Sequence, residues 1–483
     1  MAGHNQQDTH IAISYAERRW LLYLLDALAI NGGFLLALAF REDYQLSWRL
    51  LLNNPQWFLL LNGLWFFLGF LLQLYDIERA GDPRTVQIPV IGAGLLVNLL
   101  FNFVPYIPPR LPLSRQPLFI AIILPTLLLF LGRALYVLVF ARGRFRRKLL
   151  ILGAGWAGQT IFQALVEHGQ TIYKVVGFID DDRQKLGKEV VIQEDDSGRL
   201  LQEPVSADVL GSSQEILEII EKQRVSTLVL AITWDIGDEL YQLLTDCLQL
   251  ELEVIPMPLM YEQLTGKVPV EHIGDHWSIS MPLEQPGTKM AWHAVKRLFD
   301  IFWSSLGMVF LLLAFPFIAL AIKLESKGPI LYTQDRMGRK GKVFRVYKFR
   351  SMVADAETDQ AVWAQKDDPR VTRVGKLLRK THLDEFPQFW NILKGDMSVV
   401  GPRPERPEFI SQLAEEIPFY RVRLAAKPGM AGWGLIHQGY GASKEDALEK
   451  LQYDLYYIKH QSLWLDVYIL WRTVIDSLSL GGR

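Results

Sequence analysis

Residues 380–405 read K-T-H-L-D-E-F-P-Q-F-W-N-I-L-K-G-D-M-S-V-V-G-P-R-P-E. The adjacent carboxylates of Asp384 and Glu385 precede an apolar, helix-like run and a tight Gly-Pro-Arg-Pro turn. The cations that flank this pair are Arg379, Lys380, Lys394 and Arg403. A phosphoryl-transfer site needs such a set, because a metal-bound acid must meet a polyanion and nearby cations must screen its charge. The stretch therefore predicts a phosphoryl-transfer site.

The local structure of the acidic pair follows from Pro387. Proline is tolerated only in the first turn of a helix, so residues 388–393 are predicted as a buried helix that begins just before them. This places Asp384 near the N-cap and Glu385 near the first helical position. An acidic cap that only complements the helix dipole is the alternative interpretation. The surrounding cations and a turn that would hold Arg403 at fixed geometry favour a catalytic role.

Motifs on both sides of this block resemble the bacterial sugar transferases, which place a sugar 1-phosphate on a polyprenyl phosphate. The similarity runs from about residue 296 to about residue 473. Its motifs are K-R-L-F-D at 296–300, G-P-I-L-Y-T-Q-D-R-M-G at 328–338, F-R-V-Y-K-F-R-S-M at 344–352, L-D-E-F-P-Q-F-W-N-I-L-K-G-D-M-S at 383–398, G-P-R-P at 401–404 and K-P-G-M-A-G-W-G at 427–434. No single structural requirement dictates all these segments in this order, so the joint match is specific.

The resemblance implies a role for each acid. Asp384 would be a nucleophile that attacks phosphorus and forms a covalent intermediate. Glu385 would support a Mg²⁺ site or activate the acceptor, and both acids are predicted metal ligands. Arg379 and Arg403 match family arginines that hold phosphate groups. Lys348 and Arg350 are further candidates for that role.

Trp433 is open to two interpretations: stacking on a base or sugar, and packing in the core beside a glycine turn. After it, residues 437–441 read H-Q-G-Y-G, where the family commonly has Asn-Gly-Arg. This departure leaves the sugar open.

The resemblance further implies the substrates and partners. A UDP-sugar and undecaprenyl phosphate would react with Mg²⁺ as cofactor, UMP would leave, and capsule, exopolysaccharide or O-antigen synthesis would begin. Expected partners are the lipid bilayer and downstream glycosyltransferases, while a homo-oligomer stays open. Two other classes also stay open: a membrane-bound NAD-dependent nucleotide-sugar dehydratase or oxidoreductase, and a non-catalytic membrane scaffold.

The composition is that of a membrane protein with separate charged regions. Half of the 483 residues are hydrophobic, 12 % are aromatic, and the formal net charge is only −1. A general nucleic-acid binder is not expected from this balance. The single cysteine, Cys247, excludes an internal disulfide and a metal site built from cysteines. The polar first 19 residues do not resemble a removable signal.

Apolar runs near the start approach the ~20 residues needed to cross a bilayer. They span residues 20–40, 57–75, 86–107 and 117–140. Arg18 and Arg19 precede the first run, and a basic cluster at 142–148 follows the fourth. The positive-inside rule then places both the N-terminus and everything after Arg147 in the cytoplasm of a bacterial inner membrane.

Three polar residues lie inside these runs: Asp26, Asn31 and Arg133. Ionisable groups within a membrane can mark a functional site. The favoured interpretation is structural: Asp26 and Asn31 join a polar contact between helices, and Arg133 extends toward the cytoplasmic headgroups.

The fifth apolar run, residues 301–322, is predicted to be re-entrant. Pro316 in its interior kinks a helix, and cations flank both ends, so neither end prefers the outside. The resemblance implies the same, since the family's catalytic domain opens with a helix bent at a proline. A kinked helix that crosses the bilayer completely is the alternative.

The middle of the chain predicts alternating strands and helices. A strand from Lys148 runs into Gly153-x-Gly155-x-x-Gly158, and a second strand at 173–179 ends at Asp180-Asp181-Asp182. This order is the dinucleotide-binding fingerprint. A redox role would need a Tyr-x-x-x-Lys pair near the cofactor, and the chain has that spacing only at Tyr440–Lys444. We therefore expect a structural, regulatory or dimer-forming module.

These observations predict three regions. Residues 1–145 form a transmembrane bundle of four helices, and residues 146–287 form a Rossmann-like cytoplasmic α/β module. Residues 288–483 hold the re-entrant helix and a mainly α catalytic domain at the membrane surface. Its last helix, at 463–478, has the spacing of an amphipathic surface helix.

Overall fold

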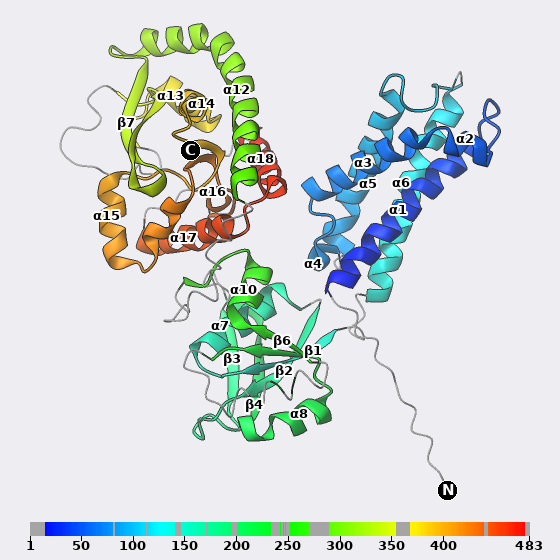
Figure 1. Ribbon diagram of the computed structural model, residues 1–483, viewed down its shortest axis with the longest axis vertical. Helices are drawn as coiled ribbons and strands as arrows, with labels where there is room; N and C mark the ends of the chain where they lie inside the picture. Colours follow the sequence, from blue (N-terminus) through cyan, green and yellow to red (C-terminus); the bar gives the residue numbers. More distant parts are fainter. Residues whose placement is uncertain are drawn as a thin grey trace. The chain divides into compact units, whose positions relative to one another are not determined.

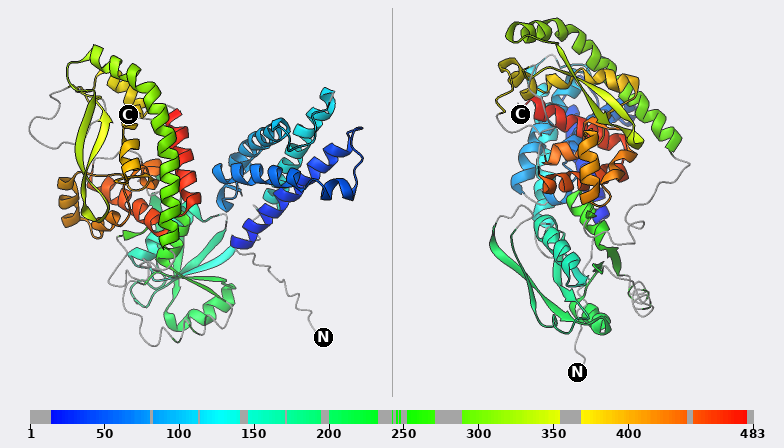
Figure 2. Two further views of the ribbon diagram at one scale, coloured as in Figure 1. Left: turned by 45° about the horizontal axis from the view of Figure 1, so that its top comes forward. Right: turned by 90° about the vertical axis from the view of Figure 1, so that its left-hand side faces the viewer.

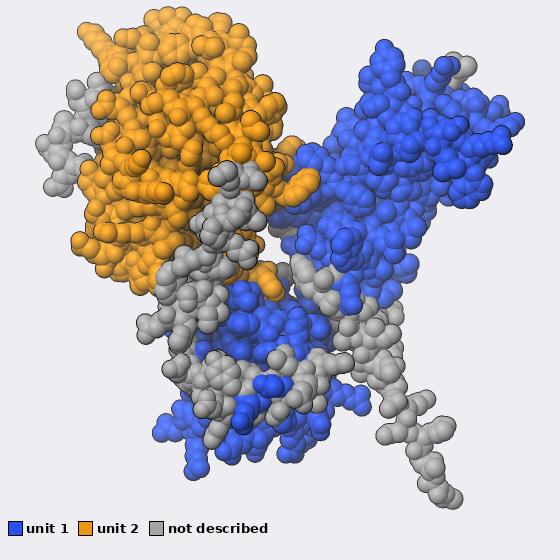
Figure 3. Space-filling model, in the orientation of Figure 1, with its two compact units in different colours: residues 1–260 blue, residues 261–483 orange. Residues whose placement is uncertain are grey.

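The computed structural model describes residues 15–80, 83–112, 114–140, 146–170, 172–194, 200–232, 252–270, 289–353, 368–438 and 443–478, with Gln242, Thr245 and Cys247. The chain divides into two compact units, Met1–Met260 and Tyr261–Arg483 (Figure 3). The region boundaries predicted at residues 145 and 287 stay predictions.

The N-terminal part of the first unit is a bundle of apolar helices (Figure 1). Its helices are α1 (Tyr15–Ala39), α2 (Trp48–Leu52), α3 (Pro55–Leu71), α4 (Ile77–Ala80), α5 (Pro83–Phe103) and α6 (Arg115–Phe140). The four predicted apolar runs are thus helical. In α1, α5 and α6 the apolar helix is long enough to cross a membrane, whereas α3 has 17 residues. The chain leaves α3 before the end of its apolar run, because it turns at Gln73, which has a positive φ of 55°.

The bundle contains a buried ion pair between Asp26 and Arg133, at 2.7 Å. Arg133 donates from Nε and Nη2 to the two oxygens of Asp26 and from Nη1 to the carbonyl of Leu74. Trp65 and Tyr75 also donate to Asp26, at 3.1 and 2.8 Å. The prediction that Arg133 extends to the headgroups is therefore wrong, because a complete set of acceptors inside the bundle offsets the cost of burying its charge.

The predicted polar contact between helices is confirmed. Asp26 in α1 meets Arg133 in α6, and Asn31 in α1 exchanges hydrogen bonds of 2.9 and 2.8 Å with Asn62 in α3. The amides of Asn31 and Asn62 thus pair with each other inside an apolar bundle. Such hydrogen bonds between polar side chains commonly join membrane helices.

The remainder of the first unit is a six-stranded mixed α/β sheet in the order β3-β4-β2-β1-β5-β6. Its elements are β1 (Arg147–Leu152), α7 (Trp156–His168), β2 (Tyr173–Ile179), β3 (Glu189–Glu194), β4 (Leu200–Gly211), α8 (Ile216–Gln223), β5 (Thr227–Leu230) and β6 (Glu253–Pro256). All neighbouring strands run parallel except β3, which pairs antiparallel with β4. Helix α8 packs with Ile179, while Phe162 of α7 contacts Phe178 at 5.4 Å. Successive strand residues face opposite sides, so helices cover both faces.

The glycine turn after β1 is closed by its own residues. Gly153 has a positive φ of 109°, and a Cβ at Gly158 would overlap the carbonyl oxygen of Gly153. The carboxylate of Asp180 accepts from the backbone N–H of Ala154 at 2.7 Å and from Lys185 at 3.0 Å. Asp180, the first acid of the predicted Asp180-Asp181-Asp182 run, thus fastens the glycine turn. Tyr440, of the Tyr-x-x-x-Lys spacing, lies outside the described residues.

The second unit opens with α12 (Lys289–Glu325), a helix of 37 residues with Pro316 in its interior. Figures 1 and 2 show that α12 is bent. An interior proline is a common cause of such a bend, because it cannot donate the helical hydrogen bond. The helix is also long and apolar enough to cross a membrane.

Short elements follow α12 along the chain and build the remainder of this unit. They are the antiparallel hairpin β7 (Leu331–Met337) and β8 (Val343–Phe349), α13 (Arg373–Lys380), α14 (Gln388–Lys394), β9 (Ser398–Val400), α15 (Pro407–Glu416), η6 (Tyr420–Ala425), β10 (Gly429–Ala431), α16 (Trp433–Gln438), α17 (Lys444–Lys459) and α18 (Leu463–Leu478). The last helix has the bounds that the sequence predicted; its place at a membrane surface stays a prediction.

The K-R-L-F-D motif fastens the first turns of α12 to three other elements. Lys296 donates to Asp466 of α18 at 2.6 Å, and Arg297 donates to the carbonyls of Ile392 and Leu393 at the end of α14. Asp300 accepts from Ser398 and Val399 of β9. The arginine satisfies carbonyls that a helix end leaves without partners. These charges therefore position α14.

The far end of α12 is fastened to α13. Glu325 accepts from the backbone N–H groups of Arg373 and Val374 at 2.7 and 2.9 Å, which satisfies donors of the first turn of α13. Both ends of α12 thus hold helices that flank the acidic pair.

Candidate active site

Asp384 and Glu385 lie in a 3₁₀ turn, η5 (Leu383–Glu385), between α13 and α14. The predicted N-cap and first-helical positions are wrong, because α14 begins at Gln388 and Pro387 is its N-cap. His382 starts the separate turn with a left-handed backbone, φ 56°. No described side chain caps α14, so the acidic pair is not its cap.

Glu385 is compensated by two cations from different elements. Lys348 of β8 donates to its Oε1 at 2.7 Å, and Arg403 of the Gly-Pro-Arg-Pro turn donates to the same oxygen at 2.7 Å. Burial alone would raise the pKa of Glu385, but Arg403 and Lys348 outweigh it and hold that pKa well below its usual range. Glu385 is therefore a permanent carboxylate that holds both cations in place.

Asp384 lies in a different electrostatic environment. Its side chain is only 8 % exposed, and no described residue forms a hydrogen bond with its carboxylate. Its pKa is raised to about 6, mainly by burial and then by the charge of Glu385. The charges of Lys348, Arg379 and Arg403 act in the opposite direction. At pH 7, above this pKa, the group is an ionised carboxylate whose oxygens accept no hydrogen bond from the described residues, which is the state that a nucleophile needs.

Arg379 of α13 is held beside the acids by a hydroxyl. Its Nε donates to Ser351 Oγ at 2.9 Å, and its charge lowers the pKa of Asp384. The structure thus brings Lys348, Arg379 and Arg403 to the acidic pair from three elements. This convergence suits a phosphate group, which arginine binds with a planar fork of donors.

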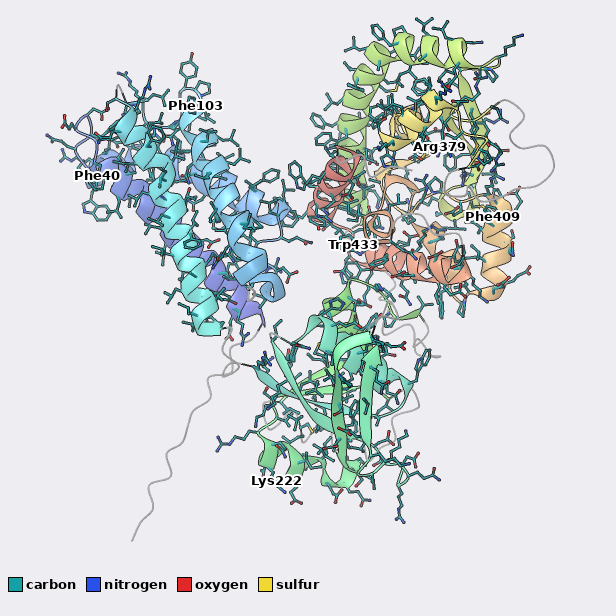
Figure 4. The ribbon with its side chains drawn as sticks, turned by 180° about the vertical axis from the view of Figure 1, so that it is seen from behind. Phe40, Phe103, Lys222, Arg379, Phe409 and Trp433 are labelled. Atoms are coloured by element: carbon teal, nitrogen blue, oxygen red, sulfur yellow. The ribbon has the colours of Figure 1, made fainter. Side chains whose placement is uncertain are left out.

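Arg350 and Trp433 have other partners. The guanidinium of Arg350 donates to the carbonyls of Ser326 and Lys327 at the end of α12. Trp433 donates to the carbonyl of Gly266 at 2.9 Å and stacks on Tyr456 at 5.6 Å. Figure 4 shows Trp433 well apart from Arg379. Arg350 and Trp433 thus make contacts that stabilise the fold. That either residue also binds a substrate stays a prediction.

Two residues near the acids had not been singled out from the sequence. Arg336 of β7 lies close enough to act on the charge of Lys348, and burial lowers its own pKa. Burial lowers the pKa of His382, and four charged side chains act on that pKa as well: those of Glu385, Arg403, Lys348 and Asp476. The sequence could have pointed to both residues, because Arg336 lies inside the motif at 328–338 and His382 directly precedes the motif at 383–398.

The donor set also bears on a metal ion. In the part of the chain that the structure describes, no group of three or more His, Cys, Asp or Glu side chains could hold one. One free carboxylate beside Glu385 is the arrangement that suits Mg²⁺, which is commonly held by one or two carboxylates together with substrate phosphates. The residues therefore fit a cation that arrives with a phosphorylated ligand.

Comparison with known proteins identifies the second unit. The bacterial sugar transferase family pattern matches residues 291–479, and a CoA-binding domain pattern matches residues 70–258. The chain is 45 % identical to a UDP-glucose:undecaprenyl-phosphate glucose-1-phosphate transferase of Klebsiella pneumoniae over 37 % of this chain and 39 % of that protein. It is 42 % identical to the exopolysaccharide production protein PSS of Rhizobium leguminosarum over 39 % of this chain and 96 % of that protein.

A further relative covers most of both chains. It is the UDP-N-acetylgalactosamine-undecaprenyl-phosphate N-acetylgalactosaminephosphotransferase of Aeromonas hydrophila, 33 % identical over 86 % of this chain and 86 % of that protein. Together with the long apolar helices, these relatives make the chain a membrane protein. The chain belongs to the bacterial sugar transferase family and is an enzyme, a phosphoglycosyl transferase.

Proposed function

We propose that this enzyme transfers a sugar 1-phosphate from a UDP-sugar to undecaprenyl phosphate. The observation that carries the proposal is the unequal acidic pair: Glu385 is neutralised by Lys348 and Arg403, while Asp384 is buried and accepts no hydrogen bond from the part of the chain that the structure describes. The names of the relatives from Aeromonas and Klebsiella support undecaprenyl phosphate as the acceptor and a UDP-sugar as the donor. They carry different sugars, so the sugar of this enzyme is left to experiment.

The chemistry runs in two displacements. An oxygen of Asp384 attacks the phosphorus that carries the sugar, the bond between the two phosphates breaks, and UMP leaves with that electron pair. The phosphate oxygen of undecaprenyl phosphate then attacks the same phosphorus, and the acyl phosphate bond to Asp384 breaks. The lipid diphosphate sugar leaves and Asp384 is a carboxylate again. Arg379, Arg403 and Lys348 are placed to offset the charge of the phosphates.

Mg²⁺ is the proposed cofactor. Asp384 and Glu385 are its predicted ligands, and it would supply positive charge between the carboxylate and the phosphates. Asp384 is the acid without a hydrogen bond, whereas Glu385 would have to give up a contact with Lys348 or Arg403. The remaining ligands would be phosphate oxygens and water.

The proposed setting is the cytoplasmic face of the bacterial inner membrane. There α12 would enter one leaflet and return at the bend near Pro316, so that Asp384 lies where a lipid phosphate and a soluble nucleotide both reach it. The α/β module would be Rossmann-like without redox work, because Asp180 is committed to the glycine turn. The enzyme would begin exopolysaccharide, capsule or O-antigen synthesis and supply downstream glycosyltransferases.

The test is a transfer assay with purified enzyme, undecaprenyl phosphate, Mg²⁺ and a panel of UDP-sugars labelled in the phosphate next to the sugar. We expect labelled lipid diphosphate sugar and equimolar UMP from one or a few donors. An NAD-dependent change of the sugar without lipid product would replace the proposal by the oxidoreductase alternative. No reaction with any donor, from folded enzyme in a bilayer, would leave the scaffold alternative.

A further inference from the structure

The turn that carries Arg403 is held through its backbone. Four consecutive carbonyls, those of Pro402, Arg403, Pro404 and Glu405, each accept a hydrogen bond from another segment. The donors are the N–H of Gly429 at 2.8 Å, Arg423 Nη2 at 3.1 Å, Arg336 Nη1 at 3.1 Å and the N–H of Met337 at 2.9 Å. Prolines 402 and 404 have no N–H, so carbonyl acceptors are the main means of fixing this backbone.

Two of these donors are charged side chains, Arg336 of β7 and Arg423 of η6, and Arg423 is the one that bonds to Arg403 itself. It is 5 % exposed, and its Nη2 donates both to the Arg403 carbonyl and to Asp454 Oδ2 of α17 at 2.7 Å. Its Nη1 donates to the hydroxyl of Tyr420 at 2.7 Å. Asp454 is itself 4 % exposed. The nitrogen Nη2 is thus oriented by a buried carboxylate and reaches the active-site turn, while Nη1 has a separate acceptor in Tyr420.

Arg423 and Asp454 form a buried ion pair, whose burial has to be offset by contacts of both partners. A buried ion pair is often no more stabilising than apolar residues of the same volume. Arg423 Nε is, in addition, a buried donor without a partner among the described residues. Arg423 is bonded to the backbone of the residue that holds Glu385, and this contact suits a role in positioning that residue.

We propose that Arg423, oriented by Asp454, is a positioning residue that fixes the direction in which Arg403 presents its guanidinium to Glu385 and to the substrate phosphate. The path runs from Asp454 of α17 through Arg423 to the Arg403 carbonyl, and from the Arg403 side chain to Glu385 Oε1. It joins a helix late in the chain to the acidic pair. The inference rests on the proposed function, since it concerns the phosphates of that reaction.

The test compares kcat and KM of Arg423→Lys with those of Tyr420→Phe in the full-length enzyme. Lysine keeps the charge opposite Asp454, but its nitrogen lies closer to the backbone than Nη2 of arginine, so it cannot meet both Asp454 and the Arg403 carbonyl with the geometry of Nη2. We expect kcat to fall about 10- to 100-fold, because small misplacements of a charge-bearing group cost that much. Tyr420→Phe removes one bond to Arg423 and leaves its contact with Arg403, so kcat should stay within twofold.

A double-mutant cycle with Arg403→Lys separates positioning from stability. If Arg423 acts through Arg403, Arg423→Lys should change kcat less than twofold once Arg403 is lysine. The same loss in both backgrounds would overturn the proposal, as would an unchanged kcat in Arg423→Lys alone. If Arg423→Lys does not fold, Asp454→Asn, which keeps the shape of the side chain, takes its place with the same expected outcomes.

The wild-type enzyme separates failure of this inference from failure of the proposed function. If it releases UMP and forms the lipid product while the cycle is additive, the positioning role alone is wrong. If it forms neither product, the proposed reaction is wrong.

Discussion

At the scale of single residues, the active site divides its charges between two neighbouring acids. Glu385 binds two cations, which hold its pKa well below the usual range of a glutamate. Asp384 receives no such donors and carries the higher pKa. Lys348 and Arg403 lie near enough to act on the charge of both acids, but their hydrogen bonds go to Glu385.

Asp384→Asn should abolish UMP release while the protein still folds. Asparagine has nearly the volume of aspartate, and the described structure assigns no hydrogen bond to the Asp384 carboxylate that folding would lose. The measurements are UMP released per enzyme in a rapid-mixing assay and the thermal unfolding temperature in detergent. A variant that still transfers sugar phosphate at a wild-type rate would exclude the covalent route.

Removal of divalent cations should stop transfer, since Asp384, the donor and the acceptor all carry negative charge. Activity should fall to background in EDTA and return on addition of Mg²⁺, and the unfolding temperature should hardly change, because the described residues contain no metal site of three or more ligands. Sodium chloride at matched ionic strength is the control. Full activity in EDTA would remove Mg²⁺ from the proposal.

At the scale of the elements, buried charges fix helices to one another. In the bundle, Arg133 of α6 and Asp26 of α1 form one ion pair that also engages Trp65 and Tyr75. In the catalytic unit, Arg297 of α12 satisfies the last carbonyls of α14, and Glu325 satisfies the first N–H groups of α13. Each helix beside the acidic pair is thus held at one end by a charged residue of α12.

Asp26→Asn should destabilise the bundle by about 3–5 kcal/mol, because it leaves the charge of Arg133 buried without its counter-ion. Asn31→Ala, in the same helix, is the matched control: it removes the contact with Asn62 and should cost about 0.6–1.7 kcal/mol. Denaturation in mixed micelles measures both. Equal effects of the two substitutions would contradict the ion pair, and Asp26→Asn combined with Arg133→Gln should recover part of the loss.

Both ends of α12 should be accessible from the cytoplasmic side only, if the bent helix returns within one leaflet. The test uses single cysteines at Ala294 and Lys327, both exposed, in a Cys247→Ser background with a membrane-impermeant thiol reagent. Lys296 is unsuitable because it forms an ion pair with Asp466. Inside-out vesicles should label at both positions and intact spheroplasts at neither. Labelling of position 327 in spheroplasts would mean that α12 crosses the membrane.

At the scale of the whole molecule, the chain holds two compact units, and residues before the family match belong to the second one. Val268 and Val270 lie in one hydrophobic cluster with Ile410 and Leu451. Glu262 accepts from Lys459 at 2.9 Å, and the carbonyl of Gly266 accepts from Trp433. The segment after Met260 is therefore a part of the catalytic unit's core.

A protein that lacks residues 1–260 should keep transfer activity in detergent or bilayers. The exopolysaccharide production protein PSS of Rhizobium leguminosarum is matched over 96 % of its length by only 194 residues of this chain, which is the reason for this expectation. A companion truncation that lacks residues 1–287 should be less stable, since each fully buried valine contributes about 1.5–3 kcal/mol. Loss of activity in the folded 261–483 protein would show that the first unit takes part in the reaction.

The sequence by itself determined the family, the acidic pair, the apolar runs and the alternating strands and helices of the middle region, because these follow from local pattern and from motifs in a fixed order. It also predicted Lys348 and Arg403 as site residues, and the structure brings both to Glu385. The tertiary structure decided which of the two acids binds the cations. It also decided that α14 starts only after Pro387 and that Arg133 meets Asp26. The hydrogen bond from Arg423 to the Arg403 carbonyl was likewise found only in the tertiary structure. The physical reason is that burial and charge compensation depend on neighbours far away in the chain, which no local pattern specifies.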